Sequence, residues 1–152
     1  MKHTKIEFRA IGVIHTPWDQ RGKAPRSTRQ ADGAEGTVEL FEEFSAGAKD
    51  LEGFERIWLI WHTDRCRSGA LTVQPPFNTP PKGVFATRSP SRPNCIALSC
   101  VRLMEVDDKA GRLRVTDVDM LDGSPLLDIK PYSPGTDSFP DCRCGWFDSI
   151  GS

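Results

Sequence analysis

Short apolar runs recur along most of this chain, many of them separated by clusters of Gly, Pro or Asp. Their apolar residues either alternate with polar ones or form continuous stretches rich in β-branched and aromatic residues, as strands do. The predicted strands are residues 8–16, 36–40, 56–62, 70–74, 83–87, 95–106, 111–121 and 125–132. Parallel strands need crossover connections of a dozen or more residues, and this chain has little helical pattern. We therefore predict a mainly β fold, a single-domain, closed or nearly closed antiparallel β-barrel.

One stretch has helical periodicity. Apolar residues recur three or four positions apart at Phe41, Phe44, Ala48 and Leu51. Gly53 stands where the C-terminal cap of such a helix is expected. We predict one short helical segment of one or two turns within residues 41–54.

The length of 152 residues is typical of one domain. We expect the barrel domain to cover residues 1–135 and a short C-terminal tail to cover residues 136–152. No apolar run approaches the roughly 18 residues of a membrane helix. Glu7 and Arg9 interrupt the N-terminal segment, unlike the apolar core of a signal peptide. These features predict a cytoplasmic protein with no membrane partner.

The five cysteines are an odd number without CxxC spacing, which indicates free thiols rather than a disulfide framework or a zinc knuckle. Cys142 and Cys144 form a CxC pair that could ligate a soft metal if a histidine lay near. A structural metal site normally needs four ligands, so we predict no metal, and an incidental pair in the tail.

The charges are distributed unevenly. Residues 65–104 hold six Lys or Arg and no Asp or Glu, although the net charge of the chain is only −1. A basic middle between acidic flanks suggests a phosphate or polyanion ligand there; the alternative is a scattered, solvated face. The nearly neutral total argues against a nonspecific nucleic-acid coat.

Several enzyme classes lack their motifs. No two glycines lie two positions apart, so there is neither a GxGxxG fingerprint nor a P-loop, and a Rossmann-type cofactor site is improbable. No GxSxG elbow is present either, which disfavours a hydrolase. Gln74 opens a Gln-Pro-Pro-Phe stretch like the loop with which amino methyltransferases hold an exocyclic amine. The alternative for this stretch is a rigid proline-rich connection.

Two longer motifs are more specific. Residues 85–94, FATRSPSRPN, place two arginines among prolines, which fix the backbone φ angles. This pattern favours a pre-ordered anion-binding site. The alternative is that one arginine pairs with an internal Asp and the other is solvated. In residues 121–132, LDGSPLLDIKPY, a turn precedes a strand that alternates Leu126, Asp128 and Lys130 on one face. Those two charges then lie side by side, and an ordinary exposed ion pair is the alternative to a functional role. For Asp122, which lies in the turn, the alternative to a functional role is a hydrogen bond to its own backbone.

Together these segments resemble the TsaA family, also called TrmO. The resemblance rests on residues 11–17 (IGVIHTP), 24–26 (APR), 51–62 (LEGFERIWLIWH), 75–76 (PP), 83–94 (GVFATRSPSRPN), 96–99 (IALS) and 121–132. It covers about residues 8 to 135. The resemblance implies a non-Rossmann methyltransferase: a β-barrel that binds S-adenosylmethionine, forms a homodimer and methylates the N6 amine of threonylcarbamoyl-modified adenosine beside the anticodon of tRNA.

The resemblance also implies site residues. The cofactor contacts carried over are Pro25, Arg26, Ser27, His62, Thr63, Arg88, Leu98, Leu121, Asp122, Gly123 and Ser124. The proposed catalytic set is Asp122, Asp128, Lys130 and Tyr132, in which either aspartate would be the polar group at the amine. The residues expected to contact RNA are Arg21, Lys23, Arg29 and Arg92.

Three alternatives of other classes stay open at this point. The first is a noncatalytic module that binds or senses S-adenosylmethionine. The second is a methyltransferase of the same fold that acts on a small molecule or another RNA base. The third is a structural β-barrel that binds other macromolecules and no cofactor.

Overall fold

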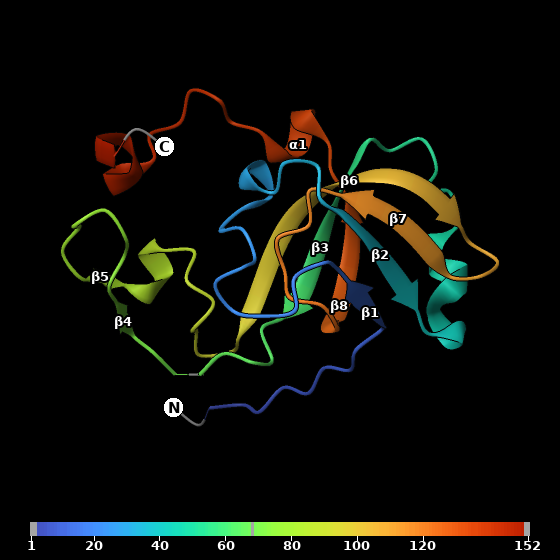
Figure 1. Ribbon diagram of the computed structural model, residues 1–152, viewed down its shortest axis with the longest axis horizontal. Coiled ribbons are helices and arrows are strands. Elements are labelled where there is room, and N and C mark those ends of the chain that lie inside the picture. Colours follow the sequence, from blue (N-terminus) through green and yellow to red (C-terminus); the bar gives the residue numbers. More distant parts are fainter. Residues whose placement is uncertain (1–2, 68, 151–152) are drawn as a thin grey trace.

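The computed structural model describes residues 3–67 and 69–150, in which six antiparallel strands close into a barrel of order β1-β2-β7-β6-β3-β8 (Figure 1). The barrel strands are β1 Gly12–His15, β2 Glu35–Leu40, β3 Arg56–His62, β6 Ile96–Asp107, β7 Arg112–Thr116 and β8 Ser124–Pro131. The predicted antiparallel barrel is confirmed.

The remaining elements are short. They are the strands β4 Thr72–Val73 and β5 Lys82–Gly83, the 3-10 helices η1 Thr28–Gln30, η2 Glu42–Ala48, η3 Val84–Ala86 and η4 Gly145–Ile150, and the helix α1 Pro134–Asp137. The strand predicted at 83–87 is wrong, because the chain turns into η3 after two residues. The segment predicted at 41–54 is η2, which ends at Ala48. Gly53 does not cap it but takes φ +98° in the turn before β3.

The barrel core is built from the inward-facing residue of each strand. Ile14, Val38, Leu59, Val101, Leu113, Val115 and Leu126 are all 0% exposed. Burial of each such side chain contributes roughly 1.5–3 kcal/mol. The alternation predicted from the sequence therefore holds in most strands, because one face of each strand meets the core.

β8 departs from the predicted alternation. Ile60 of β3 pairs with Asp128, but the next residue of β3 pairs with Leu126, so Leu127 is an extra residue in a β-bulge. Leu126 and Ile129 consequently both face the core, and the prediction that Leu126 shares a face with Asp128 is wrong. The bulge reverses the side-chain alternation once, which a strict two-residue period cannot anticipate.

Strand direction brings three of the connections to one end of the barrel. Residues 16–34, 63–95 and 117–123 join the end of one strand to the start of another at this end, which we call the loop end. Residues 117–123 also close the barrel there, because Val118 and Met120 are buried with the core residues. The segments singled out in the sequence thus meet at one place in space.

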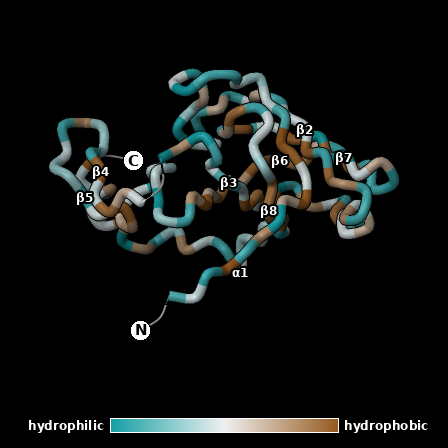
Figure 2. Tube along the Cα trace, turned by 90° about the horizontal axis from the view of Figure 1, so that it is seen from below, coloured by the Kyte–Doolittle hydropathy of each residue, from teal (hydrophilic) through white to brown (hydrophobic). Residues whose placement is uncertain are grey.

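Residues 63–67 and 69–95 form an arm that lies beside the barrel. The two-stranded β4-β5 sheet is separate from the barrel sheet, and η4 packs against the arm (Figures 1 and 2). The indole Nε1 of Trp146 donates a 2.8 Å hydrogen bond to the carbonyl of Ala86. The division into a barrel over 1–135 and a tail over 136–152 stays a prediction; its outermost residues, 1–2 and 151–152, lie outside the described residues.

Candidate functional site at the loop end

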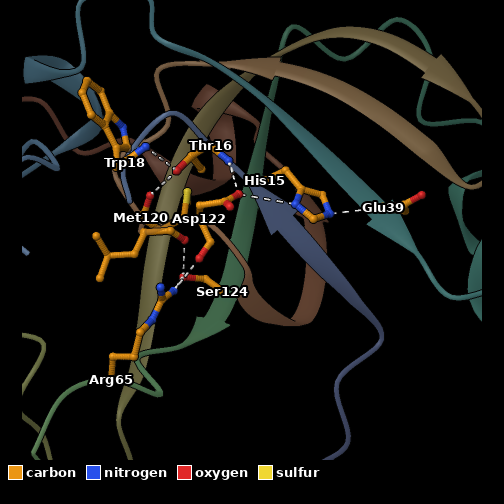
Figure 3. Close-up of polar contacts among 9 residues, drawn as sticks. His15, Thr16, Trp18, Glu39, Arg65, Met120, Asp122 and Ser124 are labelled. Atoms are coloured by element: carbon orange, nitrogen blue, oxygen red, sulfur yellow. Dashed lines mark hydrogen bonds and ion pairs between the residues drawn. The ribbon is translucent and has the colours of Figure 1, made fainter. Parts of the chain in front are cut away.

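The turn that begins β8 is tied to the end of β1. The carboxylate of Asp122 accepts a 3.0 Å hydrogen bond from the backbone N–H of Thr16 and lies 3.4 Å from Nδ1 of His15 (Figure 3). Asp122 therefore bonds another segment rather than its own turn. Gly123, at φ +77°, allows the turn and donates its N–H to the carbonyl of Ile14 at 2.9 Å.

Arg65 joins the end of β3 to the same turn. Its Nη2 donates to the carbonyl of Asp122 at 2.8 Å and to the Oγ of buried Ser124 at 3.3 Å (Figure 3). Ser124 Oγ in turn donates to the carbonyl of Leu121 at 2.7 Å. The four residues predicted at the turn, Leu121 to Ser124, are thereby held in one conformation by β1 and β3 together.

Two predicted cofactor residues meet on the arm side of β6. The exposed Arg88 donates from Nη2 to the carbonyl of Leu98 at 3.0 Å, and Leu98 is 39% exposed on the outer face of β6. A guanidinium and an apolar surface thus lie next to each other. Arg92 has a different surrounding, because its Nη1 donates to the carbonyls of Val84, Thr87 and Ser89 at 2.9–3.3 Å.

His62 and Thr63 lie where β3 leaves the barrel. Thr63 is 3% exposed, and its hydroxyl contacts the carbonyls of Pro90 and Cys95 at 3.0 and 3.1 Å. Thr63 therefore fastens the arginine-rich segment to the barrel. His62, half-buried, pairs with Ile96 at the start of β6.

The sequence prediction missed Asp119, which is partly buried beside this group. Trp61 Nε1 donates to the hydroxyl of Ser99 at 3.0 Å, and Ser99 donates to Oδ1 of Asp119 at 2.6 Å. Desolvation raises the pKa of Asp119 above its ordinary value near 3.8; the hydrogen bond from Ser99 opposes this, and Arg88 and the backbone of Thr28 oppose it further. The one signal in the sequence was an acid between the apolar Val118 and Met120.

The basic loop forms a second part of the loop end. Pro25 and Arg26 line a hollow of about 520 Å³ together with Trp18 and Phe77 of the arm. The guanidinium of Arg26 lies 5.8 Å from the centroid of the Phe77 ring. The other predicted cofactor residues do not line this hollow, so the predicted set is spread over the loop end rather than gathered in one cavity.

The residues predicted to contact RNA in the basic loop are exposed. Arg21 and Lys23 lie in the same turn, where the ammonium of Lys23 is 3.1 Å from the carboxylate of Asp19. Ser27 precedes η1, and Arg29 lies within η1, which packs near β6. The loop thus presents its cations to solvent at the loop end.

Asp128, Lys130 and Tyr132 lie elsewhere. Lys130 Nζ is 3.1 Å from the carboxylate of Asp128, so the two form the exposed ion pair that the sequence left as an alternative. Tyr132 packs edge-on against Trp58, with centroids 5.8 Å apart. Asp128 lies within β8 and pairs with Ile60 of β3, whereas Asp122 bonds the end of β1 from the turn before β8, so the two carboxylates make separate contacts.

The other candidate motifs take structural roles. The side-chain amide of Gln74 donates to the carbonyls of Pro75 and Thr79, which holds its own turn, as the rigid-connection alternative predicts. Among the residues that the structure describes, no group of three or more His, Cys, Asp or Glu is placed to hold a metal. Within the same residues, no helix has the length and apolar character needed to cross a membrane.

The chemistry of the loop end fits a zwitterionic, positively charged cofactor. Arg88 offers a guanidinium for a carboxylate, Asp119 a partly buried carboxylate for a cationic group, and Leu98 an apolar surface. Arg88 bonds the carbonyl of Leu98 and acts electrostatically on Asp119, whose carboxylate bonds Ser99, the neighbour of Leu98 in β6. This arrangement can bind and orient such a molecule without a glycine-rich loop.

The family model for the N-terminal domain of tRNA-methyltransferase O matches residues 13–138. The chain belongs to the TrmO family. A solved structure described as TrmO of Pseudomonas aeruginosa shares 34% identity and superposes with a TM-score of 0.80, covering 97% of this chain and 63% of the other. The confirmed barrel is thus also the fold of a TrmO crystal structure.

Curated members of the TrmO family carry different names. A probable S-adenosyl-L-methionine-binding protein of Pyrococcus abyssi is 48% identical over 143 residues, 94% of this chain and 77% of that protein. The tRNA (adenine(37)-N6)-methyltransferase of Escherichia coli is 33% identical over 154 aligned residues, 96% of this chain and 66% of the enzyme. The chain therefore spans about two thirds of the TrmO enzymes that it matches.

Proposed function

We propose that this chain is an S-adenosylmethionine-dependent methyltransferase whose substrate is tRNA. The observation that carries the proposal is the position of Arg88 at the loop end, where it bonds the carbonyl of Leu98 and acts electrostatically on Asp119. Membership of the TrmO family supports it, as do relatives named as S-adenosylmethionine-binding proteins and as a tRNA methyltransferase. The finer proposal is that the target is the N6 amine of threonylcarbamoyl-modified adenosine beside the anticodon.

When bound, S-adenosylmethionine supplies an activated methyl group. The residues of this chain have to bind and orient the cofactor and the substrate and to exclude water. Positioning accounts for much of the lowering of the barrier in such a displacement. Arg88 binds the cofactor carboxylate, Asp119 faces its positive charge, and Leu98 supports its adenosine. Asp122 is the proposed acceptor of the proton from nitrogen, since its carboxylate is exposed and His15 lies 3.4 Å away to share the proton.

A homodimer is the second finer proposal. The outer face of β6 exposes 38% of Ile96 and 46% of Met104, and Trp58 lies half-buried on the neighbouring strand β3. Apolar side chains in such a row favour burial against a second copy. Asp128 and Lys130 lie in β8 and Tyr132 directly follows it, away from the loop end. We propose that these residues reach the reaction site of the second copy, not that of their own chain.

The experiment that tests the function is methyl transfer. The chain is incubated with methyl-labelled S-adenosylmethionine and with tRNA that carries or lacks the threonylcarbamoyl group. We expect label in the modified tRNA alone. Label in both tRNAs would contradict the finer substrate, and label in neither, at protein concentrations that bind the cofactor, would contradict a tRNA methyltransferase.

A noncatalytic S-adenosylmethionine-binding module is the second candidate. The observation in its favour is the name of the Pyrococcus abyssi relative, which is 48% identical and is called a binding protein. Cofactor binding without label in tRNA or in a small-molecule extract would support this module. Label in the extract alone would instead support a methyltransferase of the same fold with another substrate.

A further inference from the structure

The arm carries two exposed aromatic rings, each beside a cation, and a third cation–ring pair joins the arm to η4. All three cation–ring pairs found among the described residues include the arm: Arg26 over Phe77 at 5.8 Å, Lys82 over Trp146 at 5.7 Å and Arg92 over Phe85 at 6.0 Å. Phe77 is 68% exposed and Phe85 is 77% exposed. Fully apolar rings with this exposure contribute little to the core.

The chain holds one of these rings outward at a conformational cost. Phe77 has φ +67° and Asn78 has φ +51°, a region that bulky residues rarely adopt. Two prolines precede the turn, the amide of Gln74 bonds carbonyls on both sides of it, and Thr79 Oγ1 donates to Pro76 at 3.0 Å. Strained backbone persists where the surroundings over-determine it, as these bonds do here, and it clusters at functional sites.

The second ring is fixed by a different device. Phe85 lies in η3, and the carbonyls of Val84, Thr87 and Ser89 all accept from Nη1 of Arg92. These bonds hold the Arg92 guanidinium in place 6.0 Å from the Phe85 ring. The ring and its cation are therefore pre-ordered, so a ligand that contacts both loses little conformational freedom.

The charge of the arm selects the class of ligand. Residues 65–104 contain no acid, so Lys82 and Arg92 are not neutralised from within their own segment. Proteins that bind single-stranded nucleic acid combine cations along the backbone with aromatic rings on which bases stack. Exposed rings without acids between them match this combination and differ from a solvated charged face.

We propose that the arm is a stacking surface for unpaired nucleotides of an RNA substrate, with Phe77 and Phe85 each receiving a base and Arg26, Lys82 and Arg92 contacting phosphates. The identity of that RNA as tRNA rests on the proposed function. The arm joins the barrel at the loop end, so nucleotides stacked on it flank one that enters the proposed cofactor site.

The test uses an anticodon-type stem–loop RNA with 2-aminopurine among the unpaired bases, whose fluorescence falls when that base stacks. Phe85→Ala is the main variant, because Phe85 does not line the hollow beside Arg26, whereas Phe77 does. Phe8→Ala is the matched control: Phe8 is 70% exposed, and no cation–ring pair among residues 3–67 and 69–150 includes it.

We expect Phe85→Ala to weaken stem–loop binding by roughly 5- to 150-fold, the range for one lost base–ring stack, and to remove the fluorescence change. Phe85→Trp should retain both, and Phe8→Ala should bind as the parent does. Parental RNA affinity in Phe85→Ala, an equal loss in Phe8→Ala, or no RNA binding by the parent overturns the proposal. Calorimetry with S-adenosylmethionine separates the stacking proposal from the proposed cofactor site. If the parent binds S-adenosylmethionine, the cofactor site is supported whatever the RNA result.

Discussion

We predict that Asp119→Asn gains stability relative to the parent as pH rises. The same variant should bind S-adenosylmethionine more weakly. The parent carboxyl has a raised pKa because of desolvation, so the folded state keeps the proton to higher pH than the unfolded chain does. Stability therefore falls as pH rises from the unfolded value near 3.8 through the folded pKa. The amide has no such ionisation, so the free energy of unfolding of the variant should rise relative to that of the parent across this window.

The opposing contribution is the bond from Ser99. The asparagine oxygen can still accept from the Ser99 hydroxyl, now 2.6 Å from the carboxylate, but a neutral acceptor makes this bond weaker by about 1 kcal/mol. Urea unfolding followed by tryptophan fluorescence at about pH 4.5 and about pH 8 measures the two effects. A difference between variant and parent that does not change with pH would refute the desolvation argument.

The same variant has an opposite effect on binding. A charged hydrogen bond contributes about 1.5–3 kcal/mol, so loss of the carboxylate beside Arg88 should weaken S-adenosylmethionine binding by roughly 10- to 150-fold. Calorimetry at neutral pH measures this affinity. Asp117→Asn is the control, because Asp117 is the first residue of the same segment but pairs with Arg56 at 3.1 Å. Equal affinities in parent and Asp119→Asn would show that Asp119 does not face the cofactor.

Three further predictions concern other parts of the loop end. Gly36→Ala should lower stability by about 1–3 kcal/mol, because a Cβ there would lie 2.7 Å from Val118 and 2.8 Å from the carbonyl of His15; unchanged urea unfolding would contradict it. Arg65→Ala should lower stability by about 0.5–1.5 kcal/mol and reduce cofactor affinity, since the turn after Leu121 loses both hydrogen bonds from Arg65; thermal melts and calorimetry test it. If the four predicted RNA contacts, Arg21, Lys23, Arg29 and Arg92, bind phosphates, a plot of log tRNA affinity against log salt concentration should have a slope of about −3. Lys23→Ala should make this slope shallower by about 0.7. Affinity that does not change with salt would contradict an RNA role for the basic loop.

Much of the fold could be predicted because strand periodicity and turn residues are local signals. The strand at 56–62 has the bounds predicted from its continuous apolar run, and that at 95–106 is displaced by one residue. The predicted strand at 83–87 fails because the same Val and Phe pattern also suits a 3-10 turn, in which Val84 is buried and Phe85 is exposed. Only tertiary contacts distinguish the two.

Site residues that belong to a sequence motif could be predicted. Site residues that only the strand topology brings together could not. Arg88 and Leu98 lie ten residues apart, and the structure joins them through one hydrogen bond at the end of the barrel. Asp119 had no motif, because its significance comes from Ser99 and Trp61 on two other strands. Asp128 illustrates the converse: a polar residue in a specific motif, it lies along β8, away from the turn where that motif begins.

Calorimetry of S-adenosylmethionine on the parent and on Arg88→Ala tests the proposed cofactor site most directly. Arg102→Ala is the control, because Arg102 is also an exposed arginine of the β6 region, paired with Glu55 at 3.6 Å and distant from the loop end. We predict binding by the parent and by Arg102→Ala and no measurable binding by Arg88→Ala. Parental affinity in Arg88→Ala, or no heat of binding with the parent, would contradict a cofactor site built around Arg88, Leu98 and Asp119.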